Sequence, residues 1–84
     1  MRVRYKNVII LAKSLTQTEN TVTIDMLVDK EPTHGYSRIR RLEVILDDKN
    51  QASAFMHDML TTGYKDLQGF KVICSYNTGR IREI

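Results

Sequence analysis

The sequence contains one cysteine, one proline and no tryptophan among its 84 residues. Because the single cysteine, Cys74, cannot form an internal disulfide, the chain is expected in a reducing compartment. One proline and no low-complexity tract leave no candidate linker. A chain of this length also has room for only one hydrophobic core, so residues 1–84 are predicted to form a single domain.

Long apolar runs are also missing. The longest, Val8 to Ala12, is far shorter than the roughly 20 residues that a membrane-spanning helix needs. The N-terminal segment is basic but lacks the apolar core and the small-residue cleavage site of a signal peptide. We therefore predict a soluble, cytoplasmic protein that has no membrane partner.

Residues with the spacing of a catalytic or metal site are scarce. The two histidines, His34 and His57, have no second ligand at metal-binding spacing, and zinc requires three or four converging ligands. Cys74 alternates with apolar neighbours, which is typical of a buried, unreactive thiol. The chain also lacks a phosphate-binding loop, a nucleophile elbow and a HExxH segment. These absences predict a protein that is not an enzyme and binds no metal or cofactor, unless distant residues assemble a site.

The clearest signal that the sequence does contain is a helix over residues 49–62. Asp48, with Gln51 three positions later, forms a variant of the capping box at its start. Gly63 stands where a left-handed C-cap is expected at its end. Five apolar residues at positions i, i+3, i+4, i+7 and i+8 form one stripe along it: Ala52, Phe55, Met56, Met59 and Leu60.

Before this helix, alternating apolar residues predict strands. Val3 to Leu15 is predicted to be one strand, whose second half is apolar on both faces and is expected to be buried. A polar turn at Thr16 to Asn20 follows. Val22 to Val28 then alternates cleanly between apolar and polar residues, as a half-buried strand does.

The stretch YSRIRRLEVILDD, from Tyr36 to Asp48, fits two interpretations. A helix capped by Ser37 is one. A strand is the other, because Leu42, Val44 and Leu46 alternate with other residues that include Glu43 and Asp47. The strand is preferred. Since Ile39 and Leu42 disagree in parity, the strand interpretation requires a bulge or break near Arg40 and Arg41.

After the helix, Phe70 to Tyr76 is predicted to be a strand, and a turn at Asn77 to Gly79 leads to a last strand, Arg80 to Ile84. The fold class is therefore α+β and mainly antiparallel, in the order β-β-β-α-β-β. This element order resembles that of the five-stranded oligonucleotide-binding (OB) barrel, in which a helix separates strands three and four. A two-layer fold, with one helix packed across an antiparallel sheet, is the alternative.

Positive charge concentrates in a few segments. The net charge is +3 and the isoelectric point about 9.2, which favours an acidic partner. Residues 1–13 hold four basic residues and no acidic one, while residues 14–35 and 47–68 are net acidic. In an OB-like barrel the third and fifth strands are neighbours, which would bring the arginines of residues 38–41 beside Arg80 and Arg82.

The leading hypothesis is a non-enzymatic module that binds single-stranded DNA or RNA through a basic strand face. Arginine suits phosphate because its planar fork donates two parallel hydrogen bonds. An aromatic ring supplies a face on which a base can stack. The candidate nucleic-acid-binding residues are Arg38, Arg40, Arg41, Arg80, Arg82, Arg2, Arg4, Lys6 and Tyr36.

The competing interpretation is that the basic residues are solvated surface charges with no binding partner. Basic residues on exposed strands also keep sheet edges from pairing with other chains. The alternative function is a protein-binding accessory or inhibitory factor, of the phage or mobile-element type, that modulates a host protein. Such a factor would use uncharged groups such as Leu27 and the Glu31–Tyr36 loop. A homodimer formed through an exposed first or fifth strand is a further possibility.

Overall fold

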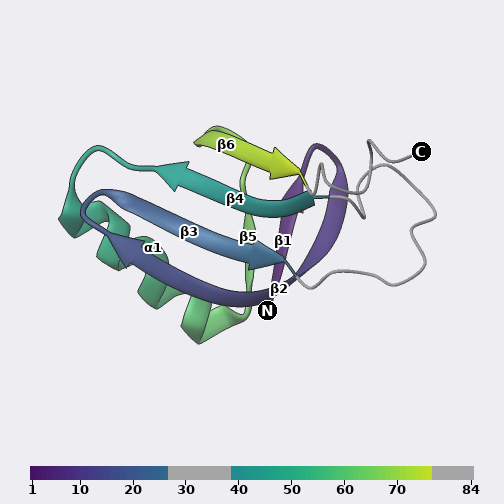
Figure 1. Cartoon of the computed structure of the whole chain (residues 1–84). Helices are drawn as coiled ribbons and strands as arrows, with labels where there is room; N and C mark the ends of the chain where they lie inside the picture. The colour runs from purple at the N-terminus through teal and green to yellow at the C-terminus, as the bar shows by residue number, and fades with distance from the viewer. Residues whose placement is uncertain (27–38, 77–84) are drawn as a thin grey trace.

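The computed structural model describes residues 1–26 and 39–76, which form one curved sheet and one helix (Figure 1). The elements are β1 (Arg2–Tyr5), β2 (Val8–Thr18), β3 (Thr21–Met26), β4 (Ile39–Ile45), α1 (Lys49–Thr62), β5 (Tyr64–Asp66) and β6 (Lys71–Tyr76). The strand order in the sheet is β5-β1-β2-β3-β4-β6. The β1–β5 pair is parallel, and the other pairs are antiparallel.

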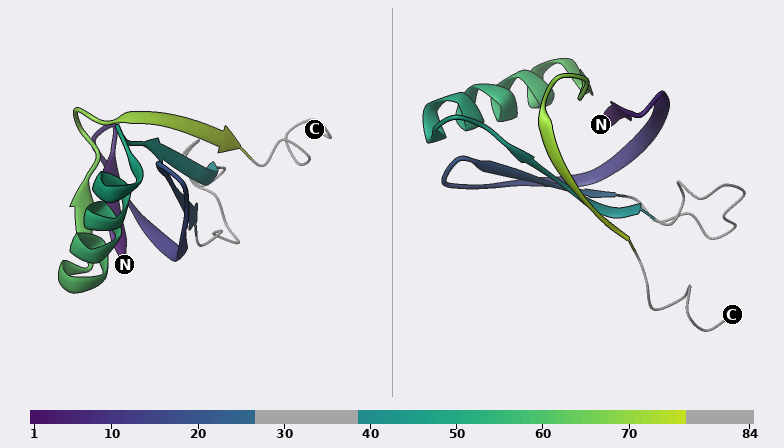
Figure 2. Two further views of the ribbon diagram at one scale, coloured as in Figure 1. Left: turned by 90° about the vertical axis from the view of Figure 1, so that its left-hand side faces the viewer. Right: turned by 90° about the horizontal axis from the view of Figure 1, so that it is seen from above.

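The sheet curls into a half-barrel, and α1 lies on its concave side (Figure 2). The helix packs against β2, β3 and β5. The largest fully buried side chains come from four elements of this arrangement: Ile24, Leu42, Met59, Val3, Val22 and Val44. The predicted α+β class is therefore confirmed. The predicted element order is wrong at two places, because the first strand is two strands and a short strand follows the helix.

The first strand divides at Lys6 and Asn7. Both residues have positive φ angles, 50° and 66°, which is the signature of a type I′ hairpin turn. Asparagine tolerates the left-handed region better than most residues, so Asn7 allows the chain to reverse there. The single strand predicted from Val3 to Leu15 is therefore the β1–β2 hairpin. The predicted polar turn over Thr16 to Asn20 is shorter than expected, because β2 continues to Thr18.

The predictions for β3 and β4 are confirmed within the described residues. Val22, Ile24 and Met26 are buried and alternate with half-buried polar residues. In β4 the register with β6 shifts between Ile39 and Arg41, which is the bulge that the sequence required. The physical reason is that Ile39 and Leu42 both reach the core, although an uninterrupted strand would point them to opposite faces.

The helix has the predicted bounds and caps. The Asp48 carboxylate accepts a hydrogen bond from the Gln51 N–H at 2.8 Å. Gly63 has a φ of 75°, and its N–H donates to the Met59 carbonyl at 2.8 Å. The predicted apolar stripe includes one residue that the sheet does not cover, because Leu60 remains 64% exposed. It lies roughly 80° around the helix axis from Ala52, beyond the surface that the sheet covers.

The strand β5 has no counterpart in the prediction. The Gly63 carbonyl accepts a hydrogen bond from the Arg2 N–H at 2.9 Å, so the chain joins β1 as soon as the helix ends. The strand β6 confirms the predicted strand before Tyr76. The predicted turn at Asn77 to Gly79 and the strand from Arg80 to Ile84 lie outside the described residues. Within residues 1–26 and 39–76, no helix is long and apolar enough to cross a membrane.

Candidate nucleic-acid interface

The candidate basic residues fall into three groups. Arg2 and Arg4 lie on β1, and Lys6 is in the turn that follows. Arg40 and Arg41 lie on β4, and both are exposed. Four candidates lie outside the described residues: Tyr36, Arg38, Arg80 and Arg82. The expected OB order, in which the strand of Arg40 and Arg41 pairs with residues 80–84, is wrong for β4, because β3 and β6 occupy its two sides.

The basic residues of β1 and β4 do not form one patch. Strands β2 and β3 lie between them, and three inter-strand spacings amount to about 14 Å along the sheet. Arg41 also has an acidic partner, because its Nε lies 2.9 Å from an Asp25 carboxylate oxygen on the neighbouring strand. Ser14 donates a hydrogen bond to the other oxygen of that carboxylate at 3.3 Å. Arg41 therefore has an acidic partner within the sheet.

The arginines of β1 have different neighbours. In the sheet, Arg2 lies between Tyr64 of β5 and Leu11 of β2, and cross-strand partners share a face. In the next row, Arg4 lies between Asp66 of β5 and Ile9 of β2. We call this outer surface of three strands the β1 face; it consists of Arg2, Arg4, Ile9, Leu11, Tyr64 and Asp66.

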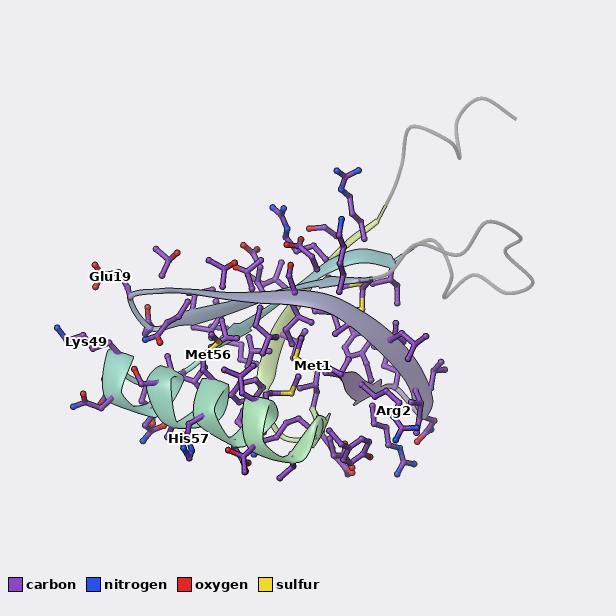
Figure 3. The ribbon with its side chains drawn as sticks, turned by 90° about the horizontal axis from the view of Figure 1, so that it is seen from below. Met1, Arg2, Glu19, Lys49, Met56 and His57 are labelled. Carbon is purple, nitrogen blue, oxygen red and sulfur yellow. The ribbon has the colours of Figure 1, made fainter. Side chains whose placement is uncertain are left out.

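The apolar members of the β1 face are open to solvent. Ile9 and Leu11 are 55% and 52% exposed, and Tyr64 is 38% exposed. The hairpin that carries Arg2 forms the end of the sheet away from Lys49 at the start of α1 (Figure 3). The second half of the predicted first strand is thus buried on one face only. This exposed apolar surface beside two arginines makes the β1 face the candidate interface.

Electrostatic contacts hold Arg4 loosely. Its guanidinium donates a hydrogen bond to the Asn7 side-chain oxygen at 3.2 Å and lies 3.9 Å from an Asp66 carboxylate oxygen. The Lys6 ammonium lies 5.4 Å from the centre of the Tyr5 ring. For Arg2 and Lys6, no carboxylate of the described residues lies within ion-pair distance. The cations of this end of the sheet are therefore less neutralised than Arg41.

A pocket of about 450 Å³ lies where the β1–β2 turn meets the segment after β5. We call it the hairpin pocket. Its wall is formed by Tyr5, Leu67, Phe70 and Val72. Its rim is polar and carries Arg4, Lys6, Asn7, Asp66 and Gln68. Arg4 and Asp66 thus belong both to the β1 face and to this pocket.

Sequence reasoning missed Tyr64, Ile9 and Leu11 as surface residues. For Ile9 and Leu11 the available signal was Asn7, a residue that permits a tight reversal within an apolar stretch. A hairpin there pairs Arg4 with Ile9 and exposes both. Tyr64 had no comparable signal. It begins a strand of only three residues directly after the helix C-cap, and nothing in so short a segment reveals that it pairs in parallel with β1. The exposed Lys13, at a bulge in β2, adds a further cation near Leu11.

Other reactive groups do not assemble into a site in the described part of the chain. There, no three histidine, cysteine, aspartate or glutamate side chains lie close enough to hold a metal ion. His57 is exposed and points away from the sheet, as expected (Figure 3). Cys74 is half-buried rather than fully buried and lies opposite Leu42.

Comparison of the chain with protein families, curated proteins and solved structures finds no match. A functional proposal for this chain therefore starts from its own residues. The strongest arrangement among the described ones is the β1 face, where two arginines alternate with exposed aromatic and aliphatic side chains.

Proposed function

We propose that this chain is a non-enzymatic module that binds single-stranded nucleic acid through the β1 face. The observation that carries the proposal is the row in which Arg2 lies between Tyr64 and Leu11, both of them exposed. A single strand offers phosphates to an arginine and unstacked base faces to an aromatic ring. The β1 face presents both kinds of group on neighbouring strands.

Single strands suit this surface better than a duplex does. Base faces are hidden in a duplex, where an exposed tyrosine and two aliphatic side chains gain little. Duplex readers commonly place a basic helix in the major groove. The exposed side of α1 lacks that charge, because its last turn has no basic residue and Lys49 is its single lysine. The OB-like closure of the sheet by residues 80–84 belongs to the same proposal.

The proposal is tested by titrating the chain with a fluorescent single-stranded oligonucleotide at several salt concentrations. Replacing both β1 arginines, Arg2→Gln with Arg4→Gln, removes two phosphate contacts. The slope of log K against log salt is then expected to fall by about 1.4, at 0.7 per contact for a single strand. The affinity at low salt is expected to fall roughly 10- to 100-fold.

Arg41→Gln is the matched control, since Arg41 is an exposed strand arginine that Asp25 already engages. It is expected to change the affinity by less than about two-fold. Equal losses from Arg41→Gln and from the β1 pair would contradict the assignment of the interface to β1. No binding at low salt would overturn the function itself.

A protein partner is the second candidate, and the exposed Ile9 and Leu11 favour it. Binding that survives high salt and is abolished by Leu11→Ser, but not by the arginine pair, would identify it. An edge-strand homodimer through the first strand is ruled out for β1, because β5 and β2 flank it. Among the described strands, β5 and β6 are the sheet edges.

A further inference from the structure

We infer that the hairpin pocket holds one nucleotide unit of the bound strand, with its base against the apolar wall and a phosphate at Lys6. The inference deepens the proposed function and rests on it. Arg4 lines the pocket and is also a member of the β1 face. A nucleic-acid strand that contacts Arg4 on the β1 face therefore lies beside the rim of the pocket.

The pocket is held in shape by its own contacts. The Leu67 N–H donates to the Arg4 carbonyl at 2.9 Å, which ties the segment after β5 to β1. The Phe70 N–H donates to the Leu67 carbonyl at 3.1 Å. The ring of Phe70 packs edge-to-face on Phe55, with ring centres 5.3 Å apart. A wall fixed in this way accepts a flat ligand without the entropic cost of ordering a loop.

The lining matches the two chemical parts of a nucleotide. Tyr5 and Phe70 are half-buried aromatic side chains, and Leu67 and Val72 complete an apolar wall for a planar base. At the rim, the side-chain amides of Asn7 and Gln68 can hydrogen-bond to the edge of a base.

The charges on the rim of the pocket decide which end of the nucleotide lies where. Lys6 supplies a cation that no described carboxylate neutralises. The Asp66 carboxylate accepts the Gln68 N–H at 3.0 Å, and its negative charge repels a phosphate from that side of the rim. The phosphate is therefore assigned to Lys6 and the base to the wall between Tyr5 and Phe70.

The test is a two-dimensional NMR titration of the full chain with adenosine 5′-monophosphate, adenosine, inorganic phosphate and a short 5′-phosphorylated oligonucleotide. Adenosine 5′-monophosphate is expected to shift the amide signals of Lys6, Asn7, Gln68 and Phe70. Lys6→Gln is expected to weaken the affinity for adenosine 5′-monophosphate about three- to ten-fold, and Lys6→Arg is expected to retain this affinity. Lys71→Gln, which removes an exposed lysine from β6, is the matched control and is expected to have no effect.

The outcomes separate the pocket from the interface. If the oligonucleotide shifts the amide signals of the pocket residues more than the mononucleotide does, a nucleotide of the bound strand lies in the pocket, as inferred. Pocket shifts with the mononucleotide but no oligonucleotide binding would overturn the proposed function and keep a free-nucleotide site. Oligonucleotide binding that leaves the pocket signals unmoved would overturn the inference alone. Equal shifts from inorganic phosphate would overturn the base assignment.

Discussion

Strands β1 and β4 of the same sheet each carry two exposed arginines, yet their surroundings differ. On β4, Arg41 lies 2.9 Å from Asp25. On β1, Arg4 lies 3.9 Å from Asp66, and Arg2 has tyrosine and leucine neighbours instead of an acid. For Arg41 and Arg2, the neighbouring strand therefore decides whether the guanidinium meets an acid. Counting basic residues along the chain does not distinguish the two strands.

The apolar neighbours differ as well. Around Arg41 the outer face of the sheet is more polar, with Thr23 opposite Glu43 and Ser75 opposite Arg41, although Ile73 is exposed there as well. The β1 face instead exposes Leu11 and Ile9 beside its arginines. A polar face is stable in water without a partner, whereas an apolar face gains free energy when it is covered. This difference is the reason for assigning binding to β1.

The largest effect expected from a single residue is at Tyr64. Tyr64→Ala removes the exposed ring beside Arg2 and is expected to cost about 1–3 kcal/mol of binding free energy if a base stacks there. That cost weakens the affinity for a single-stranded oligonucleotide about 5- to 150-fold. Fluorescence anisotropy measures it directly.

The control for Tyr64→Ala is Ile73→Ala. Ile73 is 49% exposed and lies opposite Glu43 on the β4 side of the sheet. Its removal is expected to leave the affinity unchanged. If both substitutions weakened binding equally, the contrast between the two surfaces would be lost.

A smaller effect is expected when Arg41 is released from its partner. Asp25→Asn keeps the shape of the side chain but removes the charge that holds Arg41. An exposed ion pair is worth about 0.2–1 kcal/mol, so the affinity for the oligonucleotide is expected to rise by no more than about five-fold. Adding Arg41→Gln should abolish the gain. A gain that survives this second change would show that Arg41 is not its source.

The smallest effect concerns the hairpin that carries the β1 face. Asn7→Gly places glycine at a φ of 66°, which is expected to raise the free energy of unfolding by about 0.5 kcal/mol. Urea denaturation measures this change.

Asn20→Gly is the contrasting substitution. It deletes the Asn20 side-chain hydrogen bond to the Leu46 carbonyl, 2.8 Å long, and is expected to lower the free energy of unfolding by about 1 kcal/mol. Stabilisation by both glycines would mean that the turn geometry at Asn7 is not the cause.

The positions of the helix and of most strands were predictable from the sequence, whereas the pairing of the strands was not. Asp48 and Gly63 marked the ends of the helix, and the disagreement in parity between Ile39 and Leu42 required the bulge in β4. Each of these signals is local, since a cap or a bulge depends on residues a few positions apart. The β1–β2 turn was missed because Lys6 and Asn7 lack the glycine that usually marks such a reversal.

The candidate site was predictable only in part. Arg2 and Arg4 were identified from charge alone, whereas Tyr64 came to the same surface through a parallel pairing with β1 across some 60 residues of chain. The amino-acid sequence by itself determined the α+β class, the helix with its caps, and the alternation that buries one side of β3 and β4. Only the tertiary structure decided that Asp25 engages Arg41 while Arg2 lies between a tyrosine and a leucine. The physical reason is that caps and alternation follow from steric and hydrogen-bonding rules along the chain, whereas the neighbours of a strand residue depend on strand order and register.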